Sequence, residues 1–123
     1  MFGIDERIKE VFRDAGADIP GLRGIVLSTF DGLPVASDIK SVERQNKVAA
    51  MVSALITLSR KVTSELEVGE MEAISVEAED GKIFCYAIED AAILAVITDK
   101  DINLGILRLV VPKMIDKLKE IIF

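Results

Sequence analysis

The chain has 123 residues, of which half are hydrophobic and 29% are charged, as is typical of one folded domain. Its net charge of −6 disfavours binding to nucleic acid or to an anionic membrane surface, and no apolar run is long enough to span a bilayer. With no histidine and one cysteine, the sequence excludes the usual Ser–His and Cys–His catalytic systems, imidazole metal sites and an internal disulfide.

The N-terminal segment predicts an amphipathic helix and no export signal. Met1–Glu6 is acidic and lacks secretory features, which favours a cytoplasmic protein without a membrane-inserted segment. From Ile4 to Ala15, apolar residues follow one helical stripe and charged residues fill the opposite face. We expect Gly16 to cap this helix and Pro20 to prevent its continuation.

The segment Gly24–Ser37 predicts a β-hairpin. Asp31 and Gly32 suit the centre of a type I′ turn, because both central residues of that turn need positive φ. Pro34 lacks an N–H donor, so the second strand of the hairpin is expected at one edge of a sheet.

Ser41 is predicted to cap a long helix over Val42–Leu66, which contains neither Gly nor Pro. One apolar stripe along it consists of Val48, Val52, Leu55, Val62 and Leu66. Further apolar residues, among them Met51 and Leu58, lie outside that stripe, so the helix has two faces to bury. Either both faces pack inside one chain, or one is shared with a partner, and we favour a second copy of the chain because symmetric dimers are the commonest oligomers.

Three strands follow the long helix. Ala73–Ala78 alternates with period two and is expected to be half-exposed, and Asp80–Gly81 predicts a second Asp-Gly turn. Lys82–Ile88 is the return strand, and Glu89–Asp90 predicts another turn. Ala92–Thr98 is almost continuously apolar, so we expect it at the centre of the sheet, covered on both faces.

The C-terminal segment predicts a helix capped near Asp101, with Pro112 kinking it without dividing it. The predicted order is therefore α-β-β-α-β-β-β-α. This order indicates an α+β fold, a single domain over residues 1–123 with a five-stranded antiparallel sheet.

Few residues suggest chemistry. Cys85 lies in mid-strand between Phe84 and Tyr86, and no nearby cationic group or second cysteine would activate it, so we expect a buried structural thiol. Ser28 and Thr29 have no histidine as a base, and Asp99 and Asp101 are more typical of turns and helix caps than of a cation site. We expect no catalytic residue, no metal and no cofactor, and hence not an enzyme.

The hairpin Gly24-Ile-Val-Leu-Ser-Thr-Phe-Asp-Gly-Leu-Pro-Val-Ala-Ser37 resembles that of the Roadblock family, the dynein light chain-like proteins related to longin domains. The long Ala-rich helix and the segment Asn103-Leu-Gly-Ile-Leu-Arg108 resemble further elements of the same family, whereas Pro112 departs from its last helix.

The resemblance implies a sheet with the long helix on one face and both terminal helices on the other. It also implies a non-catalytic homodimeric adaptor that regulates a small Ras-like GTPase, with paired long helices and joined edge strands. The implied dimer interface consists of Val48, Val52, Leu55, Val62, Leu66, Glu72, Ile74 and Val76. The implied partner-binding surface consists of Glu43, Arg44, Lys47, Arg60 and Lys61.

A second hypothesis is a profilin-like or PAS-like module that senses a small molecule. It requires a cavity of a few hundred Å³ between the sheet and a helix, lined by Phe84, Tyr86 and Ile97. An enzyme of unfamiliar type is a third alternative, and the sequence offers it no recognisable site.

Overall fold

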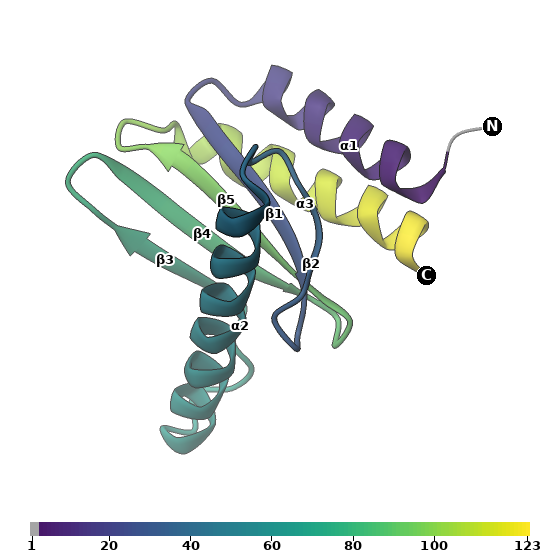
Figure 1. Ribbon diagram of the computed structural model, residues 1–123. Coiled ribbons are helices and arrows are strands. Elements are labelled where there is room, and N and C mark those ends of the chain that lie inside the picture. The colour runs from purple at the N-terminus through teal and green to yellow at the C-terminus, as the bar shows by residue number, and fades with distance from the viewer. Residues whose placement is uncertain (1–2) are drawn as a thin grey trace.

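The computed structural model describes residues 3–123, so Met1 and Phe2 of the N-terminal segment lie outside the described part. Three helices and five strands follow the predicted order (Figure 1). Their bounds are α1 Ile4–Asp18, β1 Leu22–Thr29, β2 Pro34–Ser37, α2 Val42–Glu65, β3 Ala73–Glu77, β4 Gly81–Ile88, β5 Ala92–Asp99 and α3 Leu104–Ile122. None of the helices in residues 3–123 combines the length and the apolar character needed to cross a membrane.

The strands form one antiparallel sheet in the order β2-β1-β5-β4-β3. The strand that begins with Pro34 lies at one edge, as predicted, and the alternating strand β3 lies at the other. The strand β5 is at the centre and is buried on both faces, which confirms the interpretation of its continuous apolar run.

The helices cover both faces of the sheet (Figure 1), and a separate hydrophobic core lies between the sheet and each helical layer. On one face of the sheet α1 and α3 lie side by side, and their apolar stripes pack on Ile25, Leu27 and Leu94. On the other face α2 packs on the alternate residues Val26 and Ile93. Successive side chains of the inner strands therefore pack alternately against α1 and α3 on one face and against α2 on the other.

Both predicted hairpins form, but neither has the predicted Asp-Gly pair at the centre of its turn. The Gly32 N–H donates to the Thr29 oxygen at 3.1 Å, so Phe30 and Asp31 are the central residues, and only Gly32 has positive φ, +86°. This is a three-residue hairpin loop rather than a type I′ turn. In the second hairpin the Ala78 N–H donates to the Gly81 oxygen at 2.9 Å, which leaves Glu79 and Asp80 in the loop.

Two helix boundaries also differ from the prediction. The helix α1 continues through Gly16 to Asp18, because the end is imposed by Pro20, which forces Ile19 into an extended conformation (φ −118°, ψ 91°). The helix α3 is capped by Asn103, whose side chain accepts a hydrogen bond from the Ile106 N–H at 3.1 Å, and not by Asp101. The predicted cap Ser41 is confirmed by its bond from the Arg44 N–H, and α3 runs through Pro112 as one helix.

Candidate protein-interaction surface

The helix α2 has two apolar faces, and its own sheet covers only one of them. Ala49, Val52, Ser53 and Ile56 are buried against the sheet. On another side of the helix, Met51 and Leu58 are each 62% exposed, Val62 is 47% exposed and Leu66, at the helix end, is 66% exposed. The alternative in which both faces pack inside one chain is therefore wrong for this fold.

On the face that carries α2, the helix covers the β2 side of the sheet and leaves the β3 side uncovered. Strand pairing places Ile74 and Val76 of β3 next to Cys85 and Ile83 of β4, on the face that carries α2. Val76 is exposed, whereas Ile74 and Ile83 are half-buried. These side chains extend the exposed face of α2 toward the free edge of β3, so helix and sheet together form one apolar surface.

A groove of about 530 Å³ lies along the junction of this helix and sheet. Val48, Leu55, Ile83 and Ile97 give it an apolar lining, and Arg44 stands at its border. Ile83 was not singled out from the sequence, and Ile97 was expected only in a ligand cavity together with Phe84 and Tyr86, because strand alternation alone does not show which part of a face a helix leaves open.

The predicted interface residues divide into three groups. Val48 and Leu55 are half-buried in the groove, whereas Val62, Leu66, Glu72 and Val76 are exposed and Ile74 is half-buried at the β3 edge. Val52 differs from these, because it is 6% exposed and belongs to the core between α2 and the sheet. A charge at Val52 would therefore disrupt the domain itself as well as any association.

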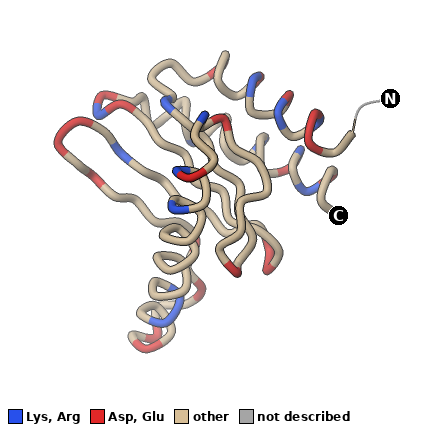
Figure 2. Tube along the Cα trace, viewed as in Figure 1, with Lys and Arg blue, Asp and Glu red and all other residues tan. Residues whose placement is uncertain are grey.

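The predicted partner-binding residues form two separate groups on α2, as Figure 2 shows for its charged residues. Glu43, Arg44 and Lys47 occupy the first turns, where Lys47 Nζ lies 3.1 Å from Glu43 Oε1. Arg60 and Lys61 lie near the other end, 13 to 18 residues later in the helix, which is about 20–27 Å along its axis at about 1.5 Å per residue. Lys61 is exposed, whereas Arg60 is directed toward the sheet.

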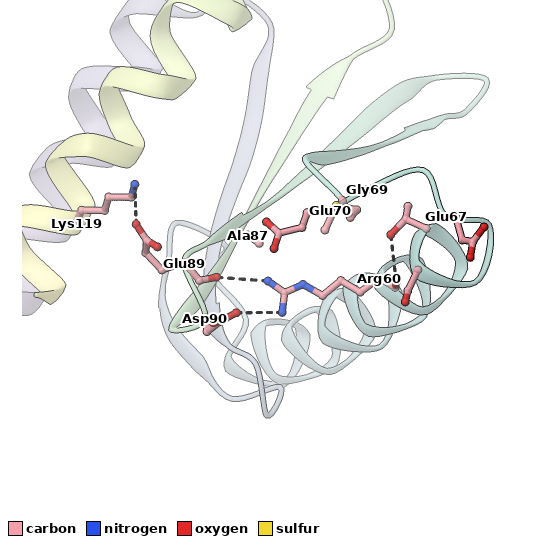
Figure 3. Close-up of a pocket in the computed structure, with 11 residues that line it drawn as sticks. Arg60, Glu67, Gly69, Glu70, Ala87, Glu89, Asp90 and Lys119 are labelled. Carbon is pink, nitrogen blue, oxygen red and sulfur yellow. Dashed lines mark hydrogen bonds and ion pairs between the residues drawn. The ribbon is translucent and has the colours of Figure 1, made fainter.

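Arg60 of α2 contacts both the β4–β5 turn and the β1–β2 hairpin, and Figure 3 shows its contacts with the turn. Its NH1 lies 3.3 Å from Asp90 Oδ1, its NH2 donates to the Glu89 oxygen at 3.4 Å, and its guanidinium stacks 4.5 Å from the ring centroid of Phe30. The partners are on the β4–β5 turn and in the β1–β2 hairpin, 30 residues away in either direction. This role of Arg60 could not be predicted from the sequence, because no local sequence pattern indicates a contact between residues so far apart in the chain.

A polar hollow of about 900 Å³ lies beside Arg60, between the end of α2, the loop that follows it and the β4–β5 turn (Figure 3). Glu67, Glu70, Glu89 and Lys119 are among its lining residues, and Lys119 Nζ pairs with Glu89 Oε1 at 3.2 Å. Within residues 3–123, no three His, Cys, Asp or Glu side chains are grouped closely enough to hold a metal ion.

The other candidate residues have structural roles. Cys85 is fully buried on the α2 face, and burial raises the pKa of its thiol to about 11, so it is protonated at neutral pH. The Ser28 hydroxyl is also buried and donates to the Thr29 oxygen. Asp99 Oδ1 lies 3.5 Å from Arg23 Nε in a surface ion pair.

The ligand cavity expected for a sensing module is not formed by its three predicted residues. Phe84 and Tyr86 belong to the layer of α1 and α3, whereas Ile97 packs on the α2 side. Strand alternation places them on opposite faces of the sheet, so they cannot line one cavity.

The arrangement defines a class of small α+β domains in which one helix covers one face of a five-stranded sheet and two helices cover the other. The sequence model for the Roadblock/LC7 domain matches residues 9–98, and the chain belongs to this family. The match ends before α3, so the last helix lies outside it.

The chain is also similar to a sequence relative and to solved structures, one of which is a Roadblock/LC7 domain. The chain is 31% identical over 99 residues to the uncharacterized protein MJ0310 of Methanocaldococcus jannaschii, covering 80% of this chain and 86% of the relative. The fold matches a Roadblock/LC7 domain from Streptomyces avermitilis with a TM-score of 0.82 at 18% identity, covering 94% of both chains. It also matches the gliding protein MglB of Thermus thermophilus with a TM-score of 0.83 at 17% identity, covering 98% of this chain and 93% of that one.

Proposed function

We propose that the chain is a non-catalytic, homodimeric adaptor that binds and regulates a small Ras-like GTPase in the cytoplasm. The observation that carries this proposal is the continuous apolar surface formed by the exposed face of α2 and the uncovered part of β3 and β4. A soluble domain rarely leaves such a surface open unless another protein covers it.

A second copy of the chain fits this surface. The edge strand β3 is free to pair with its own equivalent, and a two-fold axis beside it would bring the two copies of Leu58, Val62 and Leu66 toward one another. Burial of these side chains would supply the hydrophobic free energy of association.

The GTPase part of the proposal is supported by membership of the Roadblock/LC7 family. The structural similarity to MglB, which is known in a tetrameric arrangement, supports the association of copies of the chain. The exposed residues Glu43, Arg44, Lys47 and Lys61 would then lie on the outer surface of the paired α2 helices and contact the GTPase. Arg60 is excluded from this set in our proposal, because its guanidinium is engaged within the chain.

Leu58→Glu tests the dimer, because an unpaired carboxylate inside an apolar interface is strongly unfavourable while an exposed one costs little. We expect the wild type to sediment as a dimer at micromolar concentration and Leu58→Glu as a folded monomer with an almost unchanged melting temperature. The matched control Thr57→Glu places the same charge on the neighbouring residue, which is also exposed but does not belong to the apolar face. This variant should remain dimeric. A monomeric wild type would contradict the dimer.

Titration with small GTPases encoded in the same genome tests the partner. Binding together with faster GTP hydrolysis would indicate activation, faster nucleotide release would indicate exchange, and binding without either would indicate scaffolding. Absence of binding to every small GTPase would contradict this part of the proposal.

A further inference from the structure

The last turns of α2 have few contacts with the rest of the domain. Ile56 is the final buried residue of α2, and the helix continues for nine residues to Glu65. In Figure 1 this part of α2 projects beyond the sheet. It nevertheless carries Leu58 and Val62, two of the exposed apolar residues of the proposed interface.

Arg60 connects this projecting part to the domain. The two ends of its guanidinium fork reach the Asp90 carboxylate and the Glu89 carbonyl oxygen, and its face covers Phe30. A single exposed ion pair contributes little stability, and Asp90 is 94% exposed. The guanidinium of Arg60, however, is planar and makes three contacts at once. Together they restrict the orientation of the end of α2 as well as its distance from the turn.

The turn that Arg60 contacts is itself well held. It follows Ile88, which is fully buried, and is closed by a hydrogen bond from the Ala91 N–H to the Ile88 oxygen at 3.2 Å. On its other side the Glu89 carboxylate pairs with Lys119 of α3. Arg60 therefore ties α2 to a turn that the opposite helical layer also holds.

We propose that Arg60 is a positioning residue, which sets the direction in which the end of α2 leaves the sheet and thereby places Leu58, Val62 and Leu66 for association. This inference rests on the proposed homodimer and assigns Arg60 to the construction of the interface instead of to partner contact. Lysine could not replace it fully, because an ammonium group has no fork to reach two acceptors in a fixed geometry.

Hydrogen exchange on Arg60→Ala, with Lys61→Ala as matched control, tests the connection. The two residues are adjacent on α2, but Lys61 is exposed. In protein diluted until it is monomeric, we expect amides of residues 57–66 to exchange about tenfold faster in Arg60→Ala and unchanged in Lys61→Ala. Arg60→Lys should give an intermediate rate. Unchanged protection of β5 amides would show that the domain remains folded.

The dimer dissociation constant, measured by sedimentation, tests the consequence. We expect it to increase about tenfold in Arg60→Ala and to stay unchanged in Lys61→Ala. Equal exchange in the two variants, or an unchanged dissociation constant in Arg60→Ala, would overturn the proposal. A wild type that never dimerises would refute the interface and the positioning role together, and the exchange rates would show separately whether Arg60 holds the helix.

Discussion

At the scale of single residues, Gly16 has a different role in the structure from the one that its sequence context predicts. In the sequence it resembles a helix cap, but in the structure it lies inside α1 with φ outside the positive range. A Cβ added there would meet the Leu22 side chain at 3.8 Å, an ordinary contact distance.

We therefore expect Gly16→Ala to stabilise the domain by about 0.5–1 kcal/mol, because alanine loses less backbone entropy in a helix. Urea unfolding measures the change. Gly32→Ala is the contrasting variant, since Gly32 has φ of +86° and an added Cβ would lie 3.2 Å from Ala50 Cα, and it should be destabilised. Destabilisation by Gly16→Ala would indicate that the helix ends where the sequence alone suggested.

Cys85 provides a prediction about pH. Burial raises its pKa from 9.0 to about 11 in the folded chain, so above pH 9 the unfolded chain loses the thiol proton before the folded chain does. The free energy of unfolding should therefore decrease as pH rises from about 9 to about 11. Denaturant titrations of the wild type and Cys85→Ala measure this, and the variant should lack this part of the decrease.

Thiol reagents provide an independent measurement on Cys85. The native protein should react slowly at pH 8 and rapidly once it is unfolded, because the reactive thiolate is rare and inaccessible in the fold. Rapid reaction of the native protein would contradict the structural role assigned to Cys85.

At the scale of elements, α3 is capped by Asn103 and not by the predicted residue Asp101. Asn103 accepts the Ile106 N–H, whereas Asp101 lies two residues too early. We expect Asn103→Ala to lower the free energy of unfolding by about 1 kcal/mol and Asp101→Ala to change it much less. Chemical denaturation of both variants decides between them, and the reverse order would contradict the cap.

The sequence of α2 shows that the helix has two apolar faces, and the structure shows which residues form each face. Its excess of apolar residues predicts two buried faces without indicating which residues belong to each. The position of α2 on the sheet assigns Val52 to the core and Met51, its neighbour in the chain, to the exposed face. Leu58 is therefore a better site than Val52 for testing association, because a charge at Leu58 leaves the core of the domain intact.

At the scale of the whole molecule, the two sheet edges differ. The Ala78 N–H bonds to Gly81, and alternation along the ladder makes Val76 and Ile74 the bonded partners of β4. The N–H and carbonyl groups of Ser75 then point away from the sheet, toward a prospective partner. At the opposite edge, β2 is short and begins with Pro34.

If the proposed dimer pairs its β3 edges, Ser75→Pro should abolish it with little effect on folding, because the proline removes an outward N–H and leaves the bonds to β4 in place. Ser75→Ala keeps the N–H and should stay dimeric. Sedimentation measures association, and circular dichroism verifies the fold. A dimer that persists in Ser75→Pro would indicate association through another surface, such as the β2 edge.

The order of the elements, the central position of β5, the edge position of β2, the cap Ser41 and the family could all be predicted from the amino-acid sequence. These features depend on periodicity, capping and turn residues, which act between neighbours in the chain. The tertiary structure alone decided which face of α2 is covered, that Phe84 and Ile97 lie on opposite sides of the sheet, and what Arg60 contacts. Such features depend on how helices dock on a sheet and on residues 30 positions apart, for which the sequence carries no local signal.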